Sequence, residues 1–158
     1  ALPIYKVFSK IMFQSVGIPT GKYIYFRENE WKRDADSKIV EIEADLGYPI
    51  FVKPANMGSS VGISRVDDPS GLAAAIEEAH RWDPKVIVEN GVLGAREVEL
   101  AVLGTNGGRP RVSIAGEIVM HTDDAFYDYE AKYTPDDATV TLAIPLTRVI
   151  WSLMLIYE

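Results

Sequence analysis

Residues 50–65, with the sequence IFVKPANMGSSVGISR, constrain the fold of this chain more than any other stretch. A short apolar run ends on Lys53, a loop rich in small residues follows, and an alternating pattern returns over residues 61–64. This order predicts a strand, a turn and a second strand, because β-branched residues favour strands whereas Gly and Ser favour turns. We therefore expect a β-hairpin with a lysine at its root and backbone amides at its tip.

The turn of this hairpin has the composition of a loop that can lie over a phosphate chain. Gly58 lets the backbone approach a ligand closely, and the N–H groups and hydroxyls of Ser59 and Ser60 can donate to anionic oxygens. The stretch is not a Walker loop, because no Gly-Lys-Ser/Thr follows and no helix begins there. A Gly-Ser-Ser sequence is more often simply a turn, so the rest of the chain has to decide.

The elements around the hairpin predict an α+β fold rather than a doubly wound parallel sheet. In a first helix, apolar residues from Ile4 to Met12 follow the spacing of one helix face, and Gly17 caps it. Lys6, Lys10 and Gln14 lie off that apolar stripe, which alone would make Lys6 a solvated lysine.

Further helices are predicted over residues 39–46 and from an Asp68 cap to residue 79, with residues 29–37 as a loop or a frayed helix start. Strands are predicted over residues 22–26, 50–53, 85–89, 97–103 and 139–144, with one or two short strands over residues 111–120.

Composition narrows the classes of function. A net charge of -7 argues against a nucleic-acid partner held by a general basic field. Cysteine is absent, which excludes disulfides and thiolate metal sites, and we interpret the two histidines, His80 and His121, as surface residues. With no signal pattern and no apolar run of membrane-spanning length, we expect a cytoplasmic protein with no membrane partner.

Lysines and acids occupy positions where a ligand could be held. Lys6, Lys53 and Lys132 lie on the first helix, at the hairpin root and in the long polar segment 121–137. Glu89 ends a strand, whereas Glu97 and Glu99 share one face of the next strand, where they are either solvated acids or ligands for ribose hydroxyls. Residues 89–92 can form a hinge between two subdomains, whose backbone groups can bond a purine edge.

Two long motifs resemble one family. Residues 46–64, LGYPIFVKPANMGSSVGIS, resemble the ATP-binding hairpin of the D-alanine–D-alanine ligases, members of the ATP-grasp superfamily, and residues 126–133, FYDYEAKY, resemble the mobile ω-loop that closes over their active site. The resemblance covers roughly residues 6–145. It implies an α+β ATP-grasp fold, incomplete here, in which two α+β subdomains hold ATP between them. Residues 1–92 would be the small subdomain with the phosphate-binding hairpin, and residues 93–158 part of the larger one, with the ω-loop at 121–137.

The resemblance also implies a reaction. ATP phosphorylates the carboxylate of one D-alanine, and the amine of a second D-alanine attacks the acyl phosphate to give the dipeptide for peptidoglycan precursors, with ADP and phosphate released. The substrates are the small molecules ATP and D-alanine. Charge neutralisation by lysines, amide donors and Mg²⁺ or Mn²⁺ carries the catalysis.

The family's nucleotide contacts carry over by motif. Lys53 matches a lysine on the ATP phosphates, and Lys6 matches a second one, although Tyr5 stands where the family usually has Asp. Ser60 matches a phosphate-contacting serine. Three further matches concern the nucleoside: Glu89 for the adenine amino group, Asn90 and Val92 for hinge backbone groups, and Glu97 for the ribose hydroxyls.

Four residues match the substrate side of the family's site. Ser59 and Tyr133 match a pair that locks the closed loop, Lys132 matches a lysine that reaches the γ-phosphate, and Tyr127 matches an aromatic residue near the substrate.

The family's metal-binding acid and Glu-x-Asn run are not found, so no residue is assigned to metal, and nothing corresponds to the family's N-terminal domain. Residues 146–158 depart from the family pattern. Another ATP-grasp carboxylate–amine ligase, a D-alanine–D-lactate ligase and a nucleotide-binding module without turnover stay open as alternatives. A homodimer, common in the family, is also left open.

Overall fold

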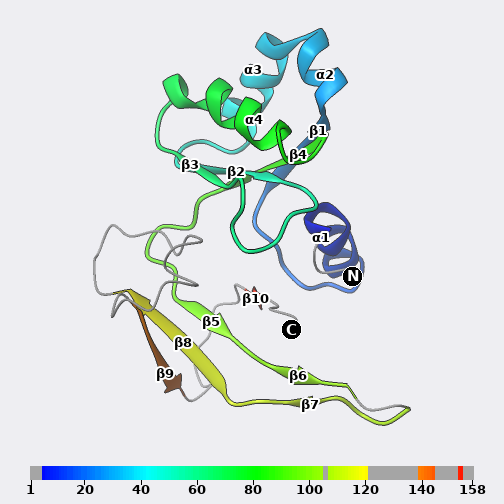
Figure 1. The fold of residues 1–158 in the computed structure, drawn as a ribbon, viewed down its shortest axis with the longest axis vertical. Helices are drawn as coiled ribbons and strands as arrows, with labels where there is room; N and C mark the ends of the chain where they lie inside the picture. Colours follow the sequence, from blue (N-terminus) through cyan, green and yellow to red (C-terminus); the bar gives the residue numbers. More distant parts are fainter. Residues whose placement is uncertain (1–4, 105–106, 121–138, 145–152, 155–158) are drawn as a thin grey trace. The chain divides into compact units, whose positions relative to one another are not determined.

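The computed structural model describes residues 5–104, 107–120, 139–144 and 153–154 of the chain. The chain divides into two compact units, residues 1–93 and residues 94–158 (Figure 1). The first unit contains helices and a sheet, and the described part of the second unit contains strands.

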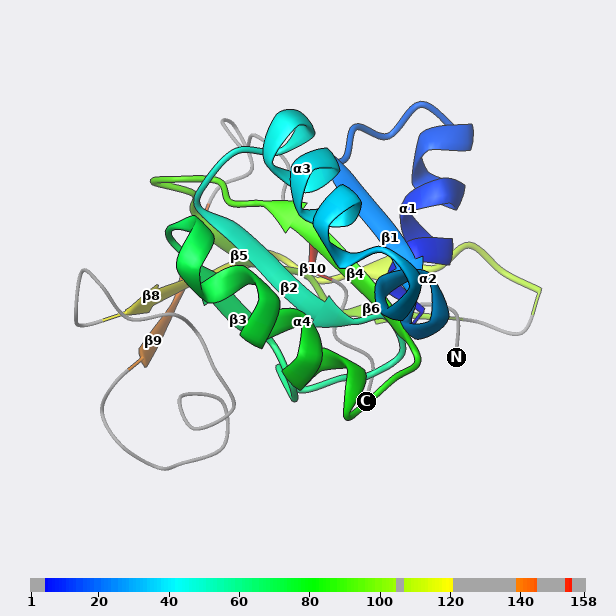
Figure 2. The same cartoon turned by 90° about the horizontal axis from the view of Figure 1, so that it is seen from above.

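The first unit is built on one four-stranded antiparallel sheet with the strand order β1-β4-β2-β3. Helices α2, α3 and α4 lie in front of the strands when the unit is seen from above (Figure 2). The strands are β1 (Tyr23–Arg27), β2 (Ile50–Pro54), β3 (Ser64–Val66) and β4 (Lys85–Asn90), and the helices are α1 (Lys6–Ser15), α2 (Glu28–Arg33), α3 (Ala35–Asp45), the 3₁₀ turn η2 (Pro69–Gly71) and α4 (Leu72–His80).

The main core lies on one face of this sheet, between the strands and α2, α3 and α4. Because side chains alternate along a strand, Val52 and Val88 point into this core while their neighbours Lys53 and Glu89 point to the opposite face. Ile42 and Ile76, from α3 and α4, close the core from the helix side, and both are completely buried. The sheet is therefore anchored by one apolar face, which leaves the other face available for polar side chains.

Two aspartates set where helices begin. Asp34 ends α2 and caps α3, with its carboxylate accepting a hydrogen bond of 3.0 Å from the Ser37 N–H. The predicted loop or frayed helix start over residues 29–37 is therefore two helices with a sharp break between them. Asp68 accepts from the Ser70 N–H at 2.8 Å, as expected for a cap, but the 3₁₀ turn η2 comes before α4.

Helix α1 is correctly predicted in extent, and Gly17 follows it with a positive φ of 78°. The expected orientation of its apolar stripe is wrong. Val7 is only 5% exposed, but Phe8 is 50% exposed and Met12 is 47% exposed. The helix instead turns its polar stripe, Lys6, Lys10 and Gln14, toward the sheet and the β2–β3 loop, where these side chains find polar partners.

His80 also departs from expectation, because it is half-buried at the end of α4 rather than on the surface. Its ring meets the Phe26 ring edge-on, and Nδ1 lies 3.3 Å from the carbonyl oxygen of Asp83. Burial lowers the pKa of His80. His121 lies outside the described residues.

In the second unit, one sheet has the strand order β10-β5-β8-β9 and a two-stranded ladder joins β6 to β7. The predicted strand over residues 97–103 is in fact two strands, β5 and β6. Residues 111–120 contain two strands, β7 and β8, in agreement with the one or two short strands expected there. Arg96 stabilises the start of β5 through two bonds of 2.6 Å to the Glu117 carboxylate on β8. The bounds are β5 (Glu97–Glu99), β6 (Val102–Leu103), β7 (Arg111–Val112), β8 (Ala115–Met120), β9 (Thr139–Ile144) and β10 (Leu153–Met154).

Among the residues that the structure describes, no helix has both the length and the apolar character needed to cross a membrane.

The apolar anchor of the first sheet predicts a specific loss of stability. Ile76→Ala should lower the free energy of unfolding by about 2–5 kcal/mol, because it opens a cavity under the sheet. Val40→Ala on α3 is the matched control, since Val40 is 66% exposed and its truncation opens no cavity. Urea unfolding of both variants measures the difference, and equal losses would contradict this description of the core.

Candidate functional site

The second face of the first sheet carries charged and aromatic side chains. Tyr23 on β1 and Phe51 on β2 stand directly opposite Glu89 on the central strand β4, one on each side of it. Lys53 lies two pairs further along β2, opposite Ile87. A carboxylate enclosed between two neighbouring strands is expensive to desolvate, so its partners decide whether this arrangement is tolerated.

Glu89 is held between two lysines from different elements. Lys53 Nζ lies 2.6 Å from Glu89 Oε2, and Lys10 Nζ, from α1, lies 3.0 Å from Glu89 Oε1. The three side chains are largely enclosed, with exposed fractions of 22% for Lys53, 17% for Lys10 and 13% for Glu89. Each oxygen of the carboxylate therefore has its own ammonium group.

This pairing fixes the charge of Glu89. Burial acts to raise the pKa of the Glu89 carboxyl, but the Lys53 and Lys10 ammonium groups outweigh it and hold the pKa below its ordinary value. A carboxyl whose folded-state pKa is lowered stabilises the fold above its unfolded pKa, and that stabilisation is lost as the pH falls through the folded pKa. At neutral pH, Glu89 is thus an anionic acceptor in a partly dry environment.

The polar stripe of α1 explains why this helix is turned against expectation. Lys6 Nζ donates to the Pro54 carbonyl at 2.9 Å and to the Met57 carbonyl, both in or next to the β2–β3 loop. Lys10 binds Glu89, and one turn later Gln14 Oε1 accepts from the Tyr23 hydroxyl at 3.2 Å. Residues four apart lie on one face of a helix, so a single face makes all these contacts. Lys6 is therefore not a solvated helix lysine.

The β2–β3 loop holds two serines in an unusual backbone conformation. Ser59 and Ser60 have positive φ angles of 52° and 58°, which non-glycine residues adopt rarely and which are enriched at active sites and ligand-binding loops. Turn bonds run from the Val61 N–H to the Gly58 carbonyl at 3.1 Å and from the Ile63 N–H to the Ser60 carbonyl at 3.2 Å. The predicted second strand over residues 61–64 is consequently shorter and displaced, since β3 begins only at Ser64.

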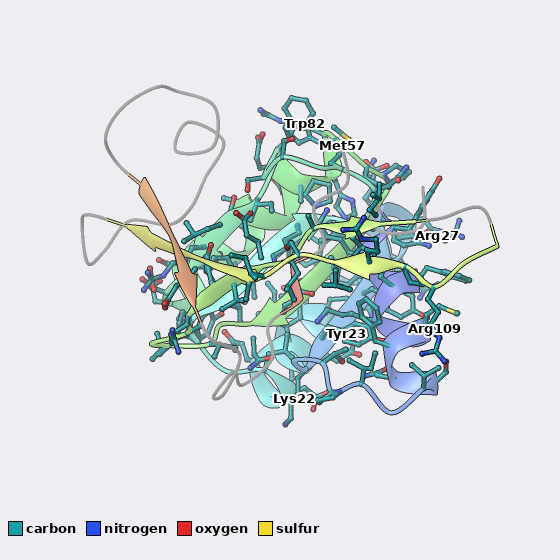
Figure 3. The ribbon with its side chains drawn as sticks, turned by 90° about the horizontal axis from the view of Figure 1, so that it is seen from below. Lys22, Tyr23, Arg27, Met57, Trp82 and Arg109 are labelled. Atoms are coloured by element: carbon teal, nitrogen blue, oxygen red, sulfur yellow. The ribbon has the colours of Figure 1, made fainter. Side chains whose placement is uncertain are left out.

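Trp82 supports the far end of this loop. Gly62 has a φ of 67°, and a Cβ placed on it would lie 2.5 Å from Trp82 Cδ1 and 2.8 Å from Pro54 Cγ. The Trp82 indole N–H donates to Glu78 Oε1 at 3.1 Å, which fixes the ring on the end of α4. Figure 3 labels Trp82 and Met57 at the same edge of the ribbon. Only a glycine fits between this ring and β2.

The predicted hinge, residues 89–92, begins within the end of β4 and continues beyond it. The Asn90 N–H donates to the Lys22 carbonyl at 3.2 Å, and the Gly91 N–H donates to the Pro49 carbonyl at 2.7 Å. A purine therefore cannot take either of these two N–H groups without breaking a bond. The Val92 side chain is 65% exposed.

The remaining predicted residues lie elsewhere. Glu97 is half-buried at the start of β5, in the second unit, where it stands opposite Ile118 on β8. Tyr127, Lys132 and Tyr133 lie outside the described residues, and so does the whole predicted ω-loop. The structure therefore brings together Lys6, Lys53, Ser59, Ser60 and Glu89 in one unit, with Asn90 and Val92 at its edge.

The described residues fit a nucleotide better than a metal ion. Lysines beside a loop with left-handed serines match anionic oxygens, and a buried carboxylate matches an amino donor. Within the described part of the chain, no group of three or more His, Asp or Glu side chains could hold a metal ion. No residue described here is therefore assigned to Mg²⁺ or Mn²⁺.

Residues 12–152 match the family model described as D-ala D-ala ligase C-terminus. The chain belongs to this family. It is 46% identical over 140 residues to the D-alanine–D-alanine ligase of Bacillus velezensis, a match that covers 89% of the chain and 38% of that relative. The corresponding ligase of Streptomyces coelicolor is 46% identical over 145 residues, which cover 90% of the chain and 36% of the relative. The chain thus spans less than two-fifths of the length of these relatives.

Solved structures confirm the predicted α+β ATP-grasp fold, present here in part. The VanG D-Ala:D-Ser ligase from Enterococcus faecalis has a TM-score of 0.68 and 34% identity, and the match covers 90% of this chain and 38% of that one. The D-alanyl-alanine synthetase A from Vibrio cholerae has a TM-score of 0.69 and 32% identity, with coverage of 89% and 40%. The resemblance to the ligase family inferred from two motifs is therefore confirmed.

Lys10 is the residue of the site that the family motifs did not single out. Its spacing was the available signal, because Lys10 follows Lys6 by one helical turn on the polar stripe. The spacing alone favours exposure to solvent, since a polar stripe on an amphipathic helix normally faces water. Here an opposing polar sheet face reverses that expectation.

The contact between Trp82 and Gly62 gives a prediction for the family's hairpin. Gly62→Ala should destabilise the first unit by roughly 1–2 kcal/mol through its positive φ and by about 1–3 kcal/mol more through the clash with Trp82 and Pro54. Gly47→Ala is the matched control, because Gly47 has a φ of 66° and nothing within 4 Å of an added Cβ. Thermal unfolding measures both variants. If they lose equal stability, Trp82 does not support the loop.

Proposed function

We propose that the protein joins two D-alanines into D-alanyl-D-alanine, with an acyl phosphate formed from ATP as the intermediate, for peptidoglycan precursor synthesis. The observation that carries the proposal is the Lys53–Glu89 pair, 2.6 Å apart and largely enclosed, at the root of a loop with two left-handed serines. The family match supplies the reaction class, since its members are ATP-dependent ligases.

In this proposal the first unit binds the nucleotide. Lys53 and Ser60 contact phosphate oxygens, and the Glu89 carboxylate accepts from the adenine amino group at the end of β4. Lys6 reaches the same phosphates from α1. Because its ammonium group already bonds the Pro54 and Met57 carbonyls, Lys6 also holds the root of the loop in place. These are charge-assisted bonds, roughly twice as strong as neutral ones.

The remaining assigned residues complete the site. Glu97 takes the ribose hydroxyls, and the backbone of Asn90 and Val92 borders the purine. Ser59 pairs with Tyr133 to hold the closed loop, Lys132 reaches the γ-phosphate, and Tyr127 lies on the substrate side. No side chain is required as a nucleophile, since the substrate carboxylate attacks the phosphoryl group and the second amine attacks the acyl phosphate. The protein then contributes alignment and charge neutralisation.

Other functions have specific support. The VanG relative is named a D-Ala:D-Ser ligase, which favours testing D-serine as the second substrate, with D-lactate tested for the depsipeptide reaction. A nucleotide-binding module without turnover is favoured by the lack of a metal-holding cluster among the described residues. For the ligase we propose the cytoplasm as the location, where ATP is at hand, with ATP and D-alanine as its small-molecule partners.

Phosphate release from the full-length protein tests the reaction. With ATP and Mg²⁺ we expect release that depends on D-alanine and forms D-alanyl-D-alanine, measured by a coupled phosphate assay and by mass spectrometry. D-serine and D-lactate added beside D-alanine identify the second substrate through the mass of the product. If the protein binds nucleotide but releases no phosphate under any of these conditions, the ligase proposal is wrong and the nucleotide-binding module without turnover is supported instead.

Lys53→Ala tests where the phosphates lie. Loss of one charge-assisted bond should weaken binding of a non-hydrolysable ATP analogue by about 1–3 kcal/mol, measured by calorimetry. Lys32→Ala is the control for net charge, because the Lys32 side chain is 69% exposed and pairs with Glu28 on the same helix. Unchanged affinity in Lys53→Ala would place the phosphates away from β2.

A further inference from the structure

Glu89 has two cationic partners, but the proposed function gives a task to only one of them. Lys53 is the lysine that turns to phosphate when ATP binds, whereas Lys10 is bound to the other carboxylate oxygen. The two lysines come from opposite directions, one from strand β2 and one from helix α1. Their tasks can therefore differ.

Because Glu89 is largely buried, one lysine cannot both neutralise its carboxylate and bind the phosphates of the nucleotide. The Glu89 side chain is only 13% exposed, and leaving a buried carboxylate without a counterion is costly. If Lys53 alone neutralised Glu89, moving its ammonium group to a phosphate would leave such a carboxylate behind. The attraction between Lys53 and Glu89 would then oppose nucleotide binding.

Lys10 is held where it can remain on Glu89 throughout. Its ammonium group lies 5.2 Å from the centre of the Tyr23 ring and 3.4 Å from the Gly21 carbonyl oxygen. Lys6 and Gln14, one turn on either side, fasten the same face of α1 to the loop and to Tyr23. Lys10 is thus anchored by the helix and not by the loop that covers the phosphates.

We propose that Lys10 is a positioning residue for nucleotide binding: it stays as the counterion of Glu89, so that Lys53 can leave the carboxylate for the phosphates. Lys10 itself does not touch the nucleotide. By holding Glu89 Oε1 it directs the other oxygen, Oε2, to the amino donor of the purine. This inference rests on the proposed nucleotide site.

The charged and titratable groups around Glu89 allow a pH test. Lys10 faces it from α1, Lys53 from β2 and Tyr23 from β1, where burial and then the neighbouring Tyr25 raise the pKa of Tyr23 further above neutrality. On β3, Arg65 pairs with Asp67 at 2.9 Å. The two lysines hold the pKa of Glu89 below its ordinary value, so Glu89 can take up a proton near neutral pH only if it loses these counterions.

The decisive variant is Lys10→Met, which keeps the length of the side chain and removes its charge. Calorimetry on the full-length protein compares adenosine with a non-hydrolysable ATP analogue. Adenosine affinity should be almost unchanged, because Lys53 still neutralises Glu89, whereas affinity for the ATP analogue should fall about tenfold at pH 8. The penalty should shrink as the pH is lowered toward 6, because Glu89 takes up a proton when Lys53 leaves it.

Two further variants separate this role from others. Lys10→Arg keeps the charge and should restore both the affinity and the flat pH profile. Lys32→Met changes the net charge equally at an exposed helix position and should leave both ligands unaffected. The nucleotide itself changes protonation over this pH range. Comparing each variant with the wild type at the same pH corrects the measured affinities for that effect.

The contrary outcomes are distinct. Equal losses for adenosine and the ATP analogue, without pH dependence, would show that Lys10 only holds α1 in place, and would overturn the inference. Unchanged affinities in Lys10→Met would overturn it as well, while the wild-type protein could still release phosphate with D-alanine. A wild-type protein that binds neither ligand would overturn both this inference and the proposed function.

Discussion

The arrangement of the first unit depends on one buried carboxylate. Glu89 lies near the end of β4, between β1 and β2, at 13% exposure, and it is tolerated because Lys53 and Lys10 approach its two oxygens at 2.6 and 3.0 Å. To bring Lys10 there, α1 must turn its polar stripe toward the sheet. That orientation places Lys6 against the carbonyls of the β2–β3 loop. Helix, strand and loop are thus fixed to one another by charge.

A polar face of this kind needs an apolar one behind it. The core between the strands and α2, α3 and α4 includes side chains with no exposure, among them Val52, Val88 and Ile76. Alternation along β2 and β4 places these residues back to back with Lys53 and Glu89. Stability and ligand chemistry therefore come from successive residues of the same strands, and a register slip of one residue would destroy both.

Much of the fold could be predicted from local pattern. The strands around residues 22–26, 50–53 and 85–89, the Asp68 cap and the family hairpin all follow from short-range spacing, and the structure contains them. The orientation of α1 could not be predicted, because hydrophobic periodicity says which residues share a face but not what that face meets. The positive φ angles of Ser59 and Ser60 and the late start of β3 could not be predicted either, since serine rarely adopts this backbone conformation.

By itself, the sequence determined the family, the α+β class and the residue types of the proposed nucleotide site, because motifs and strand alternation depend on residues that are close together in the chain. Only the tertiary structure decided that Lys53 and Lys10 share Glu89, that Lys6 holds the loop, and that Trp82 closes on Gly62. These contacts join residues from different elements. Their strength depends on burial and on the distance between charges, two quantities that exist only once the chain has folded.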